Sequence, residues 1–274
     1  MLTDRVRRHC AGVAAAARHV AIDLDADLEA GGISGLDPAL HFLEGAPDDV
    51  ARYVLILDAV NFGSGWFEEL GVTTDGLTAR LTAHARAEGP WSAGELRALD
   101  AAEVARTLAM PPAHELTRLY ATALNELGAF LPVTLGDSAE AFAEALTAMP
   151  FFADRGFYKR AQIAANDLVL AGVASFADVD RLTIFADNLV PHVLRVDGVL
   201  RYSDELAARV DAREPLPAGG VFERELRACA VHACEALAAR FGVPPRVLDN
   251  WLWNRGVRPP YSERPAHITR TVYY

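Results

Sequence analysis

Apolar residues recur every three or four positions along most of the chain, the spacing that places them on one face of an α-helix. Alanine, leucine, arginine and glutamate fill these segments, and all of them form helices readily. In HELTRLYATALNELGAFL the spacing places five residues on one face: Leu116, Leu119, Tyr120, Ala123 and Leu127. The pattern therefore predicts a mainly α-helical protein.

The same periodicity predicts further helices in SAEAFAEALTAM, YKRAQIAANDLVLAG, SDELAARVDA, FERELRACAVHACEALAARFG and PRVLDNWLWNRG. Helix ends are also marked in the sequence. WSAGELRALDAAEVARTLAM opens with a capping box, in which Ser92 accepts from the backbone N–H of Glu95 and Glu95 reaches back. Gly242, followed by two prolines, predicts the end of the longest helix.

The N-terminal stretch MLTDRVRRHCAGVAAAARHVAIDL has the basic start and alanine run of a signal peptide but no clear cleavage site. We interpret it as the first helix of the fold. Two short stretches predict strands, a small hairpin in GVTTDGLTA (71–79) and the tail HITRTVYY (267–274). Because no repeat or long linker divides the chain, we expect one few-stranded helical domain over residues 1–274. Two lobes around a cleft would be compatible with it.

The composition limits the partners of this protein. Its 274 residues are 51% hydrophobic, enough for a sizeable core, and its net charge is −11. That charge argues against a general nucleic-acid binder, although a few local cations could still hold a small anion. The three cysteines, an odd number, are typical of a reduced intracellular protein. With no run of eighteen apolar residues, we expect no membrane span and a cytoplasmic location.

The known cofactor and metal motifs are not matched. LDAVNFGSGWF looks like a strand leading into a glycine-rich phosphate loop, but Glu68 stands where the third glycine belongs. The sequence contains no HExxH and no pair of CxxC motifs. We therefore expect neither a cofactor nor a metal.

Four stretches combine apolar with polar residues in a way that packing alone does not require. FYKRAQI places Tyr158 and Lys159 at a helix start, where free N–H groups favour an anion. The alternative is that Lys159 and Arg160 form a solvated basic pair. In LDAVNFGSGWF, Asn61 and Phe62 follow an apolar segment. The alternative there is an ordinary helix C-terminus with a glycine stop.

The other two stretches place carboxylates among apolar residues. TIFADNLVPHVL holds Asp187 two residues after Phe185; the alternative is that Asp187 caps a helix that continues past a proline. In VLDNWLWNRG, Asp249 precedes Trp251 and Trp253; the alternative is core packing by the tryptophans with Asp249 exposed. Flat aromatic walls, carboxylates and a cation together suit a pocket for a heterocycle that bears a phosphorylated sugar.

The motifs FYKRAQI, FAD followed by LVP, YSDEL, LDNWLW and the final YY resemble the queuosine salvage protein family, whose members are queuosine 5′-phosphate N-glycosylases/hydrolases. The resemblance is strongest over 157–274 and weaker at 58–62 and near His41, while 71–149 has no match. It implies a fold similar to the helical DNA glycosylases. It also implies cleavage between the ribose C1′ and the 7-deazaguanine nitrogen, which releases queuine for tRNA modification.

The resemblance also implies roles for individual residues. The catalytic aspartate falls on Asp187, and the base-contacting positions fall on His41, Phe185 and Asp249. Lys159 becomes a candidate partner for the phosphate or for a neighbouring acid. NFGSGWF departs from the family's aromatic-rich NFxFW, so the wall contributed by that loop differs here. Asp187 could act as a base, a nucleophile or an electrostatic stabiliser.

Two other functions are compatible with the sequence. A nucleic-acid glycosylase would share the implied fold, but the acidic composition argues against it. A non-catalytic helical module could bind queuine or a nucleotide without turning it over. We expect a small-molecule partner, queuosine 5′-phosphate with queuine as product, and no direct contact with nucleic acid or membrane. Turnover of the ligand distinguishes an enzyme from a binding module.

Overall fold

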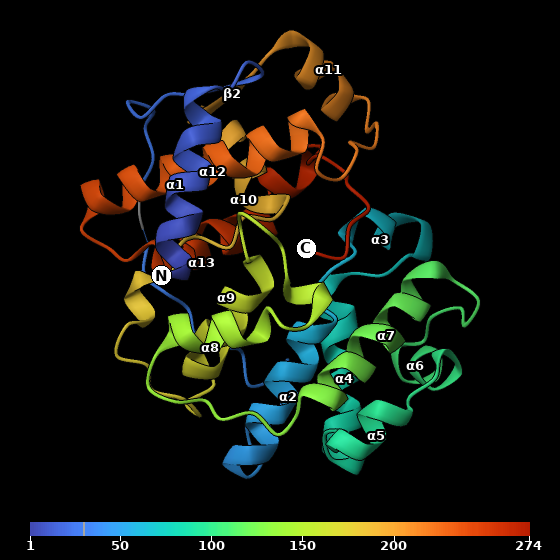
Figure 1. Cartoon of the computed structure of the whole chain (residues 1–274). Helices are drawn as coiled ribbons and strands as arrows, with labels where there is room; N and C mark the ends of the chain where they lie inside the picture. The colour runs from blue at the N-terminus through green and yellow to red at the C-terminus, as the bar shows by residue number, and fades with distance from the viewer. Residues whose placement is uncertain (30) are drawn as a thin grey trace.

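Thirteen α-helices and one small sheet make up the regular structure of the computed structural model, which describes residues 1–29 and 31–274 (Figure 1). The helices are α1 (Leu2–Ala15), α2 (Pro47–Ala59), α3 (Ser64–Leu70), α4 (Thr74–Glu88), α5 (Ala93–Ala98), α6 (Ala101–Leu108), α7 (Glu115–Phe130), α8 (Ala139–Leu146), α9 (Lys159–Leu170), α10 (Leu189–Val196), α11 (Asp204–Asp211), α12 (Val221–Phe241) and α13 (Pro245–Gly256). Short 3₁₀ turns lie at Pro150–Phe152, Val179–Arg181 and Tyr261–Glu263. Strands β1 (Val20–Ile22) and β2 (Leu200–Tyr202) pair antiparallel. The prediction of a mainly α-helical fold is confirmed.

The helices gather in two groups (Figure 1). Helices α2 and α4–α7 lie together at the lower right of the view, and α1 and α10–α13 lie together at the top. Helices α8 and α9 lie between them; α9 packs on α2 as well as on α8. Helices α8 and α9 therefore link the two groups together, because α8 also packs on α1. The likeness to helical DNA glycosylases and the two lobes around a cleft stay predictions.

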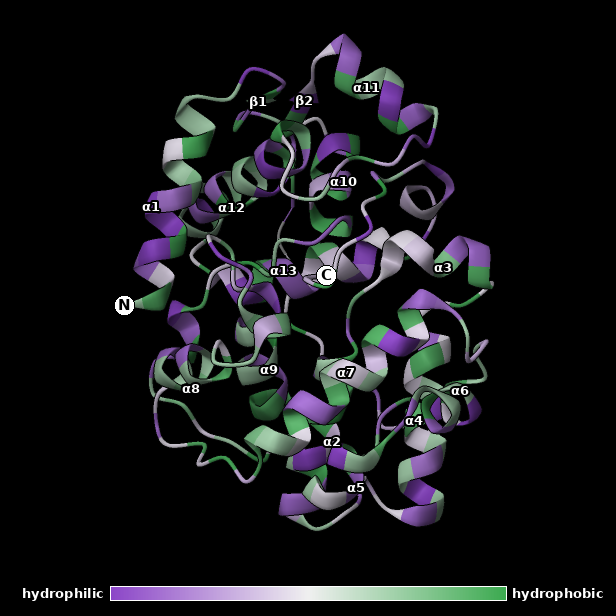
Figure 2. Cartoon of the chain, turned by 45° about the vertical axis from the view of Figure 1, so that its right-hand side comes forward, coloured by the Kyte–Doolittle hydropathy of each residue, from purple (hydrophilic) through white to green (hydrophobic). Residues whose placement is uncertain are grey.

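One face of most helices is apolar, as the periodicity predicted. Polar and apolar residues alternate along the helices in Figure 2, as expected where one face of each helix is buried. In α7, Leu116, Tyr120, Ala123 and Leu127 are buried, and Leu119 is half-buried at the edge of the face. The predicted capping box at Ser92 and Glu95 is present at the start of α5.

A buried arginine holds α9 in place. Arg160 donates to the carbonyls of Asp58 and Ala59 at the end of α2 and to those of Phe151 and Val272. The last carbonyls of a helix lack intrahelical partners, so this guanidinium satisfies α2 while anchoring α9 and the C-terminal segment. The alternative of a solvated basic pair is wrong, because both Lys159 and Arg160 are buried.

The predicted hairpin at 71–79 is wrong. Its threonines suggested a strand, but Thr73 is the N-cap of α4 and its side chain accepts from the N–H of Gly76 at 3.1 Å. Threonine is a good N-cap because its hydroxyl replaces a missing backbone acceptor. The first residues of the predicted hairpin therefore precede a helix, and the rest belong to it.

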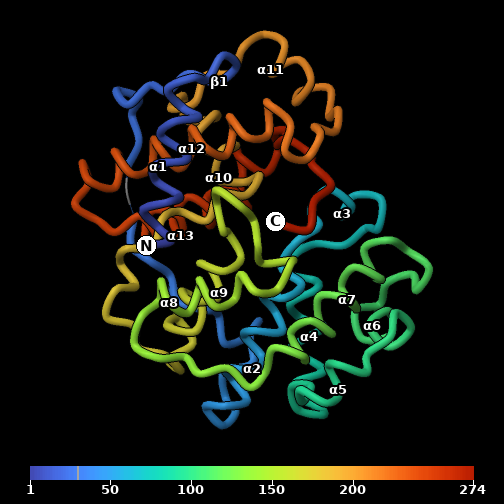
Figure 3. The backbone as a smooth tube through the Cα atoms, viewed as in Figure 1, coloured from blue at the N-terminus to red at the C-terminus, as the bar shows by residue number. Residues whose placement is uncertain are grey.

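The predicted strand in the tail is also not formed, apart from a single bridge between Ile268 and Pro215. The backbone groups of the tail bind elsewhere: Val272 accepts from Arg160, and Tyr274 accepts from the N–H of Gly63 at 2.9 Å. The tail ends in the middle of the view, beside the start of α3 (Figure 3). A segment predicted as a strand is thus a connector between the two groups of helices.

The first helix is shorter than predicted, because α1 ends at Ala15 and β1 follows it. All three cysteines are buried and free of disulfide bonds. Among the helices of the described chain, none is both long and apolar enough to cross a membrane.

Candidate active site

Asp187 lies buried at the start of α10, with 8% of its surface exposed. Its Oδ1 atom accepts from the backbone N–H groups of Leu189 at 2.8 Å and Val190 at 3.1 Å. Asp187 therefore caps α10, and Pro191 is tolerated because it lies in the first turn. Within residues 1–29 and 31–274, the Oδ2 atom accepts no hydrogen bond. Capping uses one oxygen and leaves the other available for chemistry.

Lys159 lies close to this carboxylate. It is the first residue of α9 and is buried. Burial lowers the pKa of its ammonium group, and the nearby carboxylates of Asp187, Asp58 and Asp249 oppose that shift. Of the two alternatives open for Lys159, a phosphate or a neighbouring acid, these surroundings favour the acid.

Asp249 lies buried on α13 rather than exposed, so the alternative of an exposed Asp249 is wrong. Its Oδ1 atom accepts from the backbone N–H of Phe185 at 2.7 Å. Burial raises the pKa of Asp249 to about 8, and the negative charge of Asp187 adds to the shift. Near pH 7 this carboxyl group is therefore largely protonated and can donate a hydrogen bond.

Two further carboxyl groups belong to the same cluster, and neither was predicted from the sequence as a site residue. Asp58, near the end of α2, is fully buried, and neither carboxyl oxygen has a hydrogen-bond partner in the part of the chain described. Asn61 lies beside it without reaching hydrogen-bond geometry. Burial raises the pKa of Asp58 well above its usual range, with repulsion from Asp167 adding to the shift, and burial raises that of Asp167 to about 6. The position of Asp58 in the apolar run VLILDAV could have revealed it, by the reasoning applied to Asp187.

The remaining predicted residues have different surroundings. Phe62 is a core residue: its carbonyl accepts from the Tyr120 hydroxyl at 2.8 Å, and its ring lies 4.6 Å from the Arg160 guanidinium. Tyr158 lies beneath the Arg5 guanidinium of α1, at 5.6 Å from it. These two aromatic side chains are engaged in packing.

Of the other four predicted positions, three keep part of their surface exposed. Phe185 is buried, whereas Asn61 and Trp253 are half-buried. Trp253 lies one turn after Asp249 on the same face of α13. His41 is half-exposed, and its Nδ1 lies 3.0 Å from the carbonyl oxygen of Asp37. In the described chain no hydrogen bond or ion pair joins His41 to the carboxylate cluster.

A second buried charge network, centred on Arg227, holds the backbone that carries the carboxylate cluster. The guanidinium of Arg227, on α12, pairs with Asp154 and Glu223 and packs on the ring of Phe157 at 3.9 Å. Its Nε atom donates to the carbonyl of Ala186 at 2.9 Å, directly before Asp187. Sequence reasoning missed Arg227, because it appears there only as one polar position in an amphipathic helix.

The same network reaches the start of α9. Asp154 accepts from the backbone N–H of Lys159 at 3.4 Å while it pairs with Arg227. One ion pair therefore fixes both the turn that carries Asp187 and the helix start that carries Lys159. The relative position of the two groups follows from this shared anchor.

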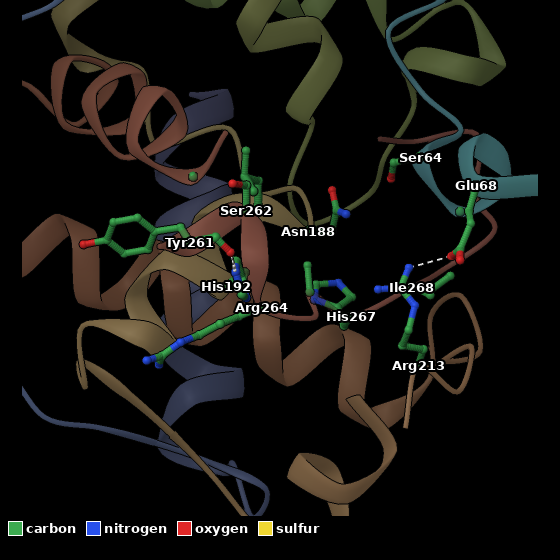
Figure 4. Close-up of a pocket in the computed structure, with 14 residues that line it drawn as sticks. Ser64, Glu68, Asn188, His192, Arg213, Tyr261, Ser262, Arg264, His267 and Ile268 are labelled. Atoms are coloured by element: carbon green, nitrogen blue, oxygen red, sulfur yellow. Dashed lines mark hydrogen bonds and ion pairs between the residues drawn. The ribbon is translucent and has the colours of Figure 1, made fainter. Parts of the chain in front are cut away.

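A cavity of about 300 Å³ lies beside the Asp187 turn, since Asn188 and Leu189 line it (Figure 4). Helix α3, His192, Arg213 and residues between Gly256 and Ile268 form the other walls. A space of this size can admit a sugar phosphate.

Residues 138–274 match the family described as "Queuosine salvage protein". A protein of Sphaerobacter thermophilus named "Queuosine 5'-phosphate N-glycosylase/hydrolase" is 35% identical, over 86% of this chain and 84% of its own length. Proteins of the same name from Dictyostelium discoideum and Mus musculus are 36% and 35% identical, each over 43% of this chain and 40% of their own length. The resemblance seen in the motifs is confirmed: the chain belongs to the queuosine salvage protein family.

Proposed function

We propose that this protein hydrolyses the N-glycosidic bond of queuosine 5′-phosphate and releases queuine. The proposal rests on the burial and hydrogen bonding of the Asp187 side chain. Its carboxylate is buried, held at one oxygen by two backbone N–H groups, and open at the other. The names of the relatives supply the substrate.

The reaction replaces one bond at the ribose C1′ with another. The oxygen of a water molecule bonds to C1′ while the bond from C1′ to the base nitrogen breaks, and that electron pair goes to the base. One water proton leaves the attacking oxygen and one proton is gained by the base. Because the sugar becomes cationic on the way, a carboxylate at C1′ stabilises the transition state.

In this proposal, Asp187 faces C1′ with its free oxygen. It stabilises the cationic sugar and can take the proton of the attacking water. The two N–H donors and the positive end of α10 complement its negative charge. Lys159 adds a positive charge nearby, inside a buried region where electrostatic interactions are strong.

In this proposal, Asp249 acts on the departing base, whereas Asp187 acts on the sugar. A 7-deazapurine carries carbon at position seven, so it offers no nitrogen there to protonate. A neutral carboxylic acid can instead donate to another edge of the departing base. The raised pKa of Asp249, about 8, keeps it in that donating form near pH 7.

The decisive experiment is incubation of the purified protein with queuosine 5′-phosphate, followed by mass spectrometry for queuine and ribose 5-phosphate. We expect both products in equal amounts. If the nucleotide is bound but unchanged, the protein is a binding module, and the proposal fails. Release of queuine from intact tRNA but not from the free nucleotide would point instead to a nucleic-acid glycosylase.

A further inference from the structure

The segment that leads into Asp187 is buried without belonging to a sheet. Residues 182–186 are each at most 3% exposed, and they lie outside β1 and β2. Within the part of the chain that the structure describes, no backbone group of residues 183–186 pairs with another backbone group. Buried backbone groups need hydrogen-bond partners, so this segment depends on side chains in place of a neighbouring strand.

Side chains from three helices bind this segment. Asp249 of α13 accepts from the backbone N–H of Phe185 at 2.7 Å. Arg227 of α12 donates to the carbonyl of Ala186 at 2.9 Å. The third side chain is that of Gln162 on α9, which carries no charge. All three contacts fall within the four residues before the proposed catalytic aspartate, so together they define the position of its backbone.

Both polar atoms of the Gln162 side chain are hydrogen-bonded inside the protein. The Oε1 atom accepts from the backbone N–H of Thr183 at 3.0 Å. The Nε2 atom donates to the hydroxyl of Thr183 at 3.0 Å and to the carbonyl of Phe157 at 2.9 Å. Because Gln162 is 0% exposed, a ligand does not reach it, and it acts only through these partners.

The hydrogen bonds of Gln162 join the two segments that carry the charged groups of the site. Phe157 lies two residues before Lys159, and Thr183 lies four residues before Asp187. The buried charge network of α12 connects the same two segments. The protein therefore holds Asp187 relative to Lys159 in two ways, by ion pairs and by a neutral amide.

We propose that Gln162 is a positioning residue, whose carboxamide fixes the segment before Asp187 so that the free oxygen of this carboxylate faces the ribose C1′. The effect on catalysis rests on the proposed function, whereas the fixation of the segment does not. An amide suits this role because it donates and accepts at the same time and adds no charge beside the carboxylates. Misplacement of a reacting group by about 1 Å can reduce a rate about 10²-fold, so Gln162 influences kcat without touching the substrate.

Gln162→Met removes both hydrogen-bonding atoms at nearly constant size, and we expect kcat for queuosine 5′-phosphate to fall about tenfold. KM should change by less than about twofold, because the groups that contact the substrate remain. The matched control is Asn125→Leu on α7, where the amide donates to the carbonyls of Leu96 and Leu99. This control should lose stability but keep the wild-type kcat. A wild-type kcat in Gln162→Met would overturn the positioning role.

A conservative variant separates hydrogen bonding from packing. Gln162→Glu keeps an acceptor for the N–H of Thr183, and the protonated form of the new carboxyl group, which burial favours, keeps one donor. At pH 6 we expect its kcat to exceed that of Gln162→Met by about threefold or more. Thr183→Val is the milder change, because it removes only the hydroxyl and keeps the shape, and it should lower kcat about threefold. Equal kcat values in the Glu and Met variants, or a wild-type kcat in Thr183→Val, would contradict the proposal.

Amide hydrogen exchange, followed by NMR without substrate, tests the fixation of the segment independently of turnover. In Gln162→Met, the N–H groups of Phe185, Leu189 and Val190 should exchange about tenfold faster than in the wild type, after correction for the change measured on α7. Gln162 bonds none of these three groups, so the acceleration would report a displaced segment. Faster exchange confined to Thr183 would refute the fixation. If the wild type releases no queuine, the proposed function fails, while the exchange rates still decide on Gln162.

Discussion

Two buried charge clusters lie back to back in this protein, and they differ in how completely their groups are bonded. Around Arg227, one cation meets Asp154, Glu223 and the carbonyl of Ala186, all within hydrogen-bond distance. Around Lys159, one cation faces several carboxyl groups. Some of their oxygens have no partner in the described chain, and the pKa values of three are raised by burial.

The difference indicates that the Arg227 cluster has a structural role and the Lys159 cluster a chemical one. A fully bonded cluster has little to offer a ligand, but its removal leaves charges stranded in the core. A cluster with unsatisfied carboxyl groups is unfavourable in the empty protein and becomes useful when a substrate supplies the missing partners. Perturbed pKa values gather at such functional sites. The first cluster therefore positions the second.

The largest effect should follow from breaking the Arg227 cluster. Arg227→Met leaves Asp154 and Glu223 buried without their cation, and we expect the free energy of unfolding to fall by about 3–5 kcal/mol. Urea denaturation measures it. Arg5→Gln, which breaks an exposed pair with Glu144, is the control and should cost less than about 1 kcal/mol. Similar losses in the two variants would contradict the structural role of Arg227.

A smaller effect, of a different kind, is expected at Asp187. Asn keeps the capping oxygen but removes the negative charge, so Asp187→Asn should lower kcat by roughly 10²–10³, about 2.7–4 kcal/mol. The thermal midpoint should change little. The assay is queuine release at saturating nucleotide, with the thermal midpoint measured in parallel. An Asn variant with wild-type rates would reduce Asp187 to a helix cap.

Substitution of Lys159 should cause an intermediate loss of activity, and this loss should not depend on whether the substrate carries a phosphate. Because its main charged neighbour is the carboxylate of Asp187, Lys159→Met should lower kcat/KM by roughly tenfold to a hundredfold for nucleotide and nucleoside alike. The comparison of both substrates is the measurement. A loss confined to the nucleotide would instead assign Lys159 to the phosphate.

Much of this arrangement could be predicted from the sequence, for physical reasons. Periodicity reveals helices because it records which face is buried, and a carboxylate in an apolar run stands out. The same reasoning applied to 71–79 and 267–274 failed, because threonine serves both strands and helix caps, and because distant partners, Arg160 and Gly63, bind the tail.

The site was predicted in part, and the missing part depends on tertiary structure. Lys159, Asp187 and Asp249 lie in motifs and are brought together by the fold. Arg227 and Asp167 lie in amphipathic helices, where the sequence gives no sign of which polar residues face inward. Tyr158 and Phe62 looked like walls of a pocket, but their rings contact buried or neighbouring arginines.

The smallest effect is expected in the pH dependence of the free energy of unfolding, and it comes from the protonation of Asp249. Burial and the negative charges of Asp187 and Asp167 raise its pKa, against the opposing charge of Lys159, to about 8 from an unfolded value of about 3.8. Between these values the folded protein binds more protons than the unfolded chain, so this group makes stability fall as pH rises. The slope for one group is at most about 1.4 kcal/mol per pH unit.

We expect the free energy of unfolding to decrease from pH 6 to pH 7 in the wild type by more than in Asp249→Asn, which cannot titrate. Urea denaturation of both proteins at the two pH values isolates this contribution, because all other titrating groups are common to them. Parallel pH profiles would mean that Asp249 is already ionised in the folded protein, and it could then only accept hydrogen bonds from the base.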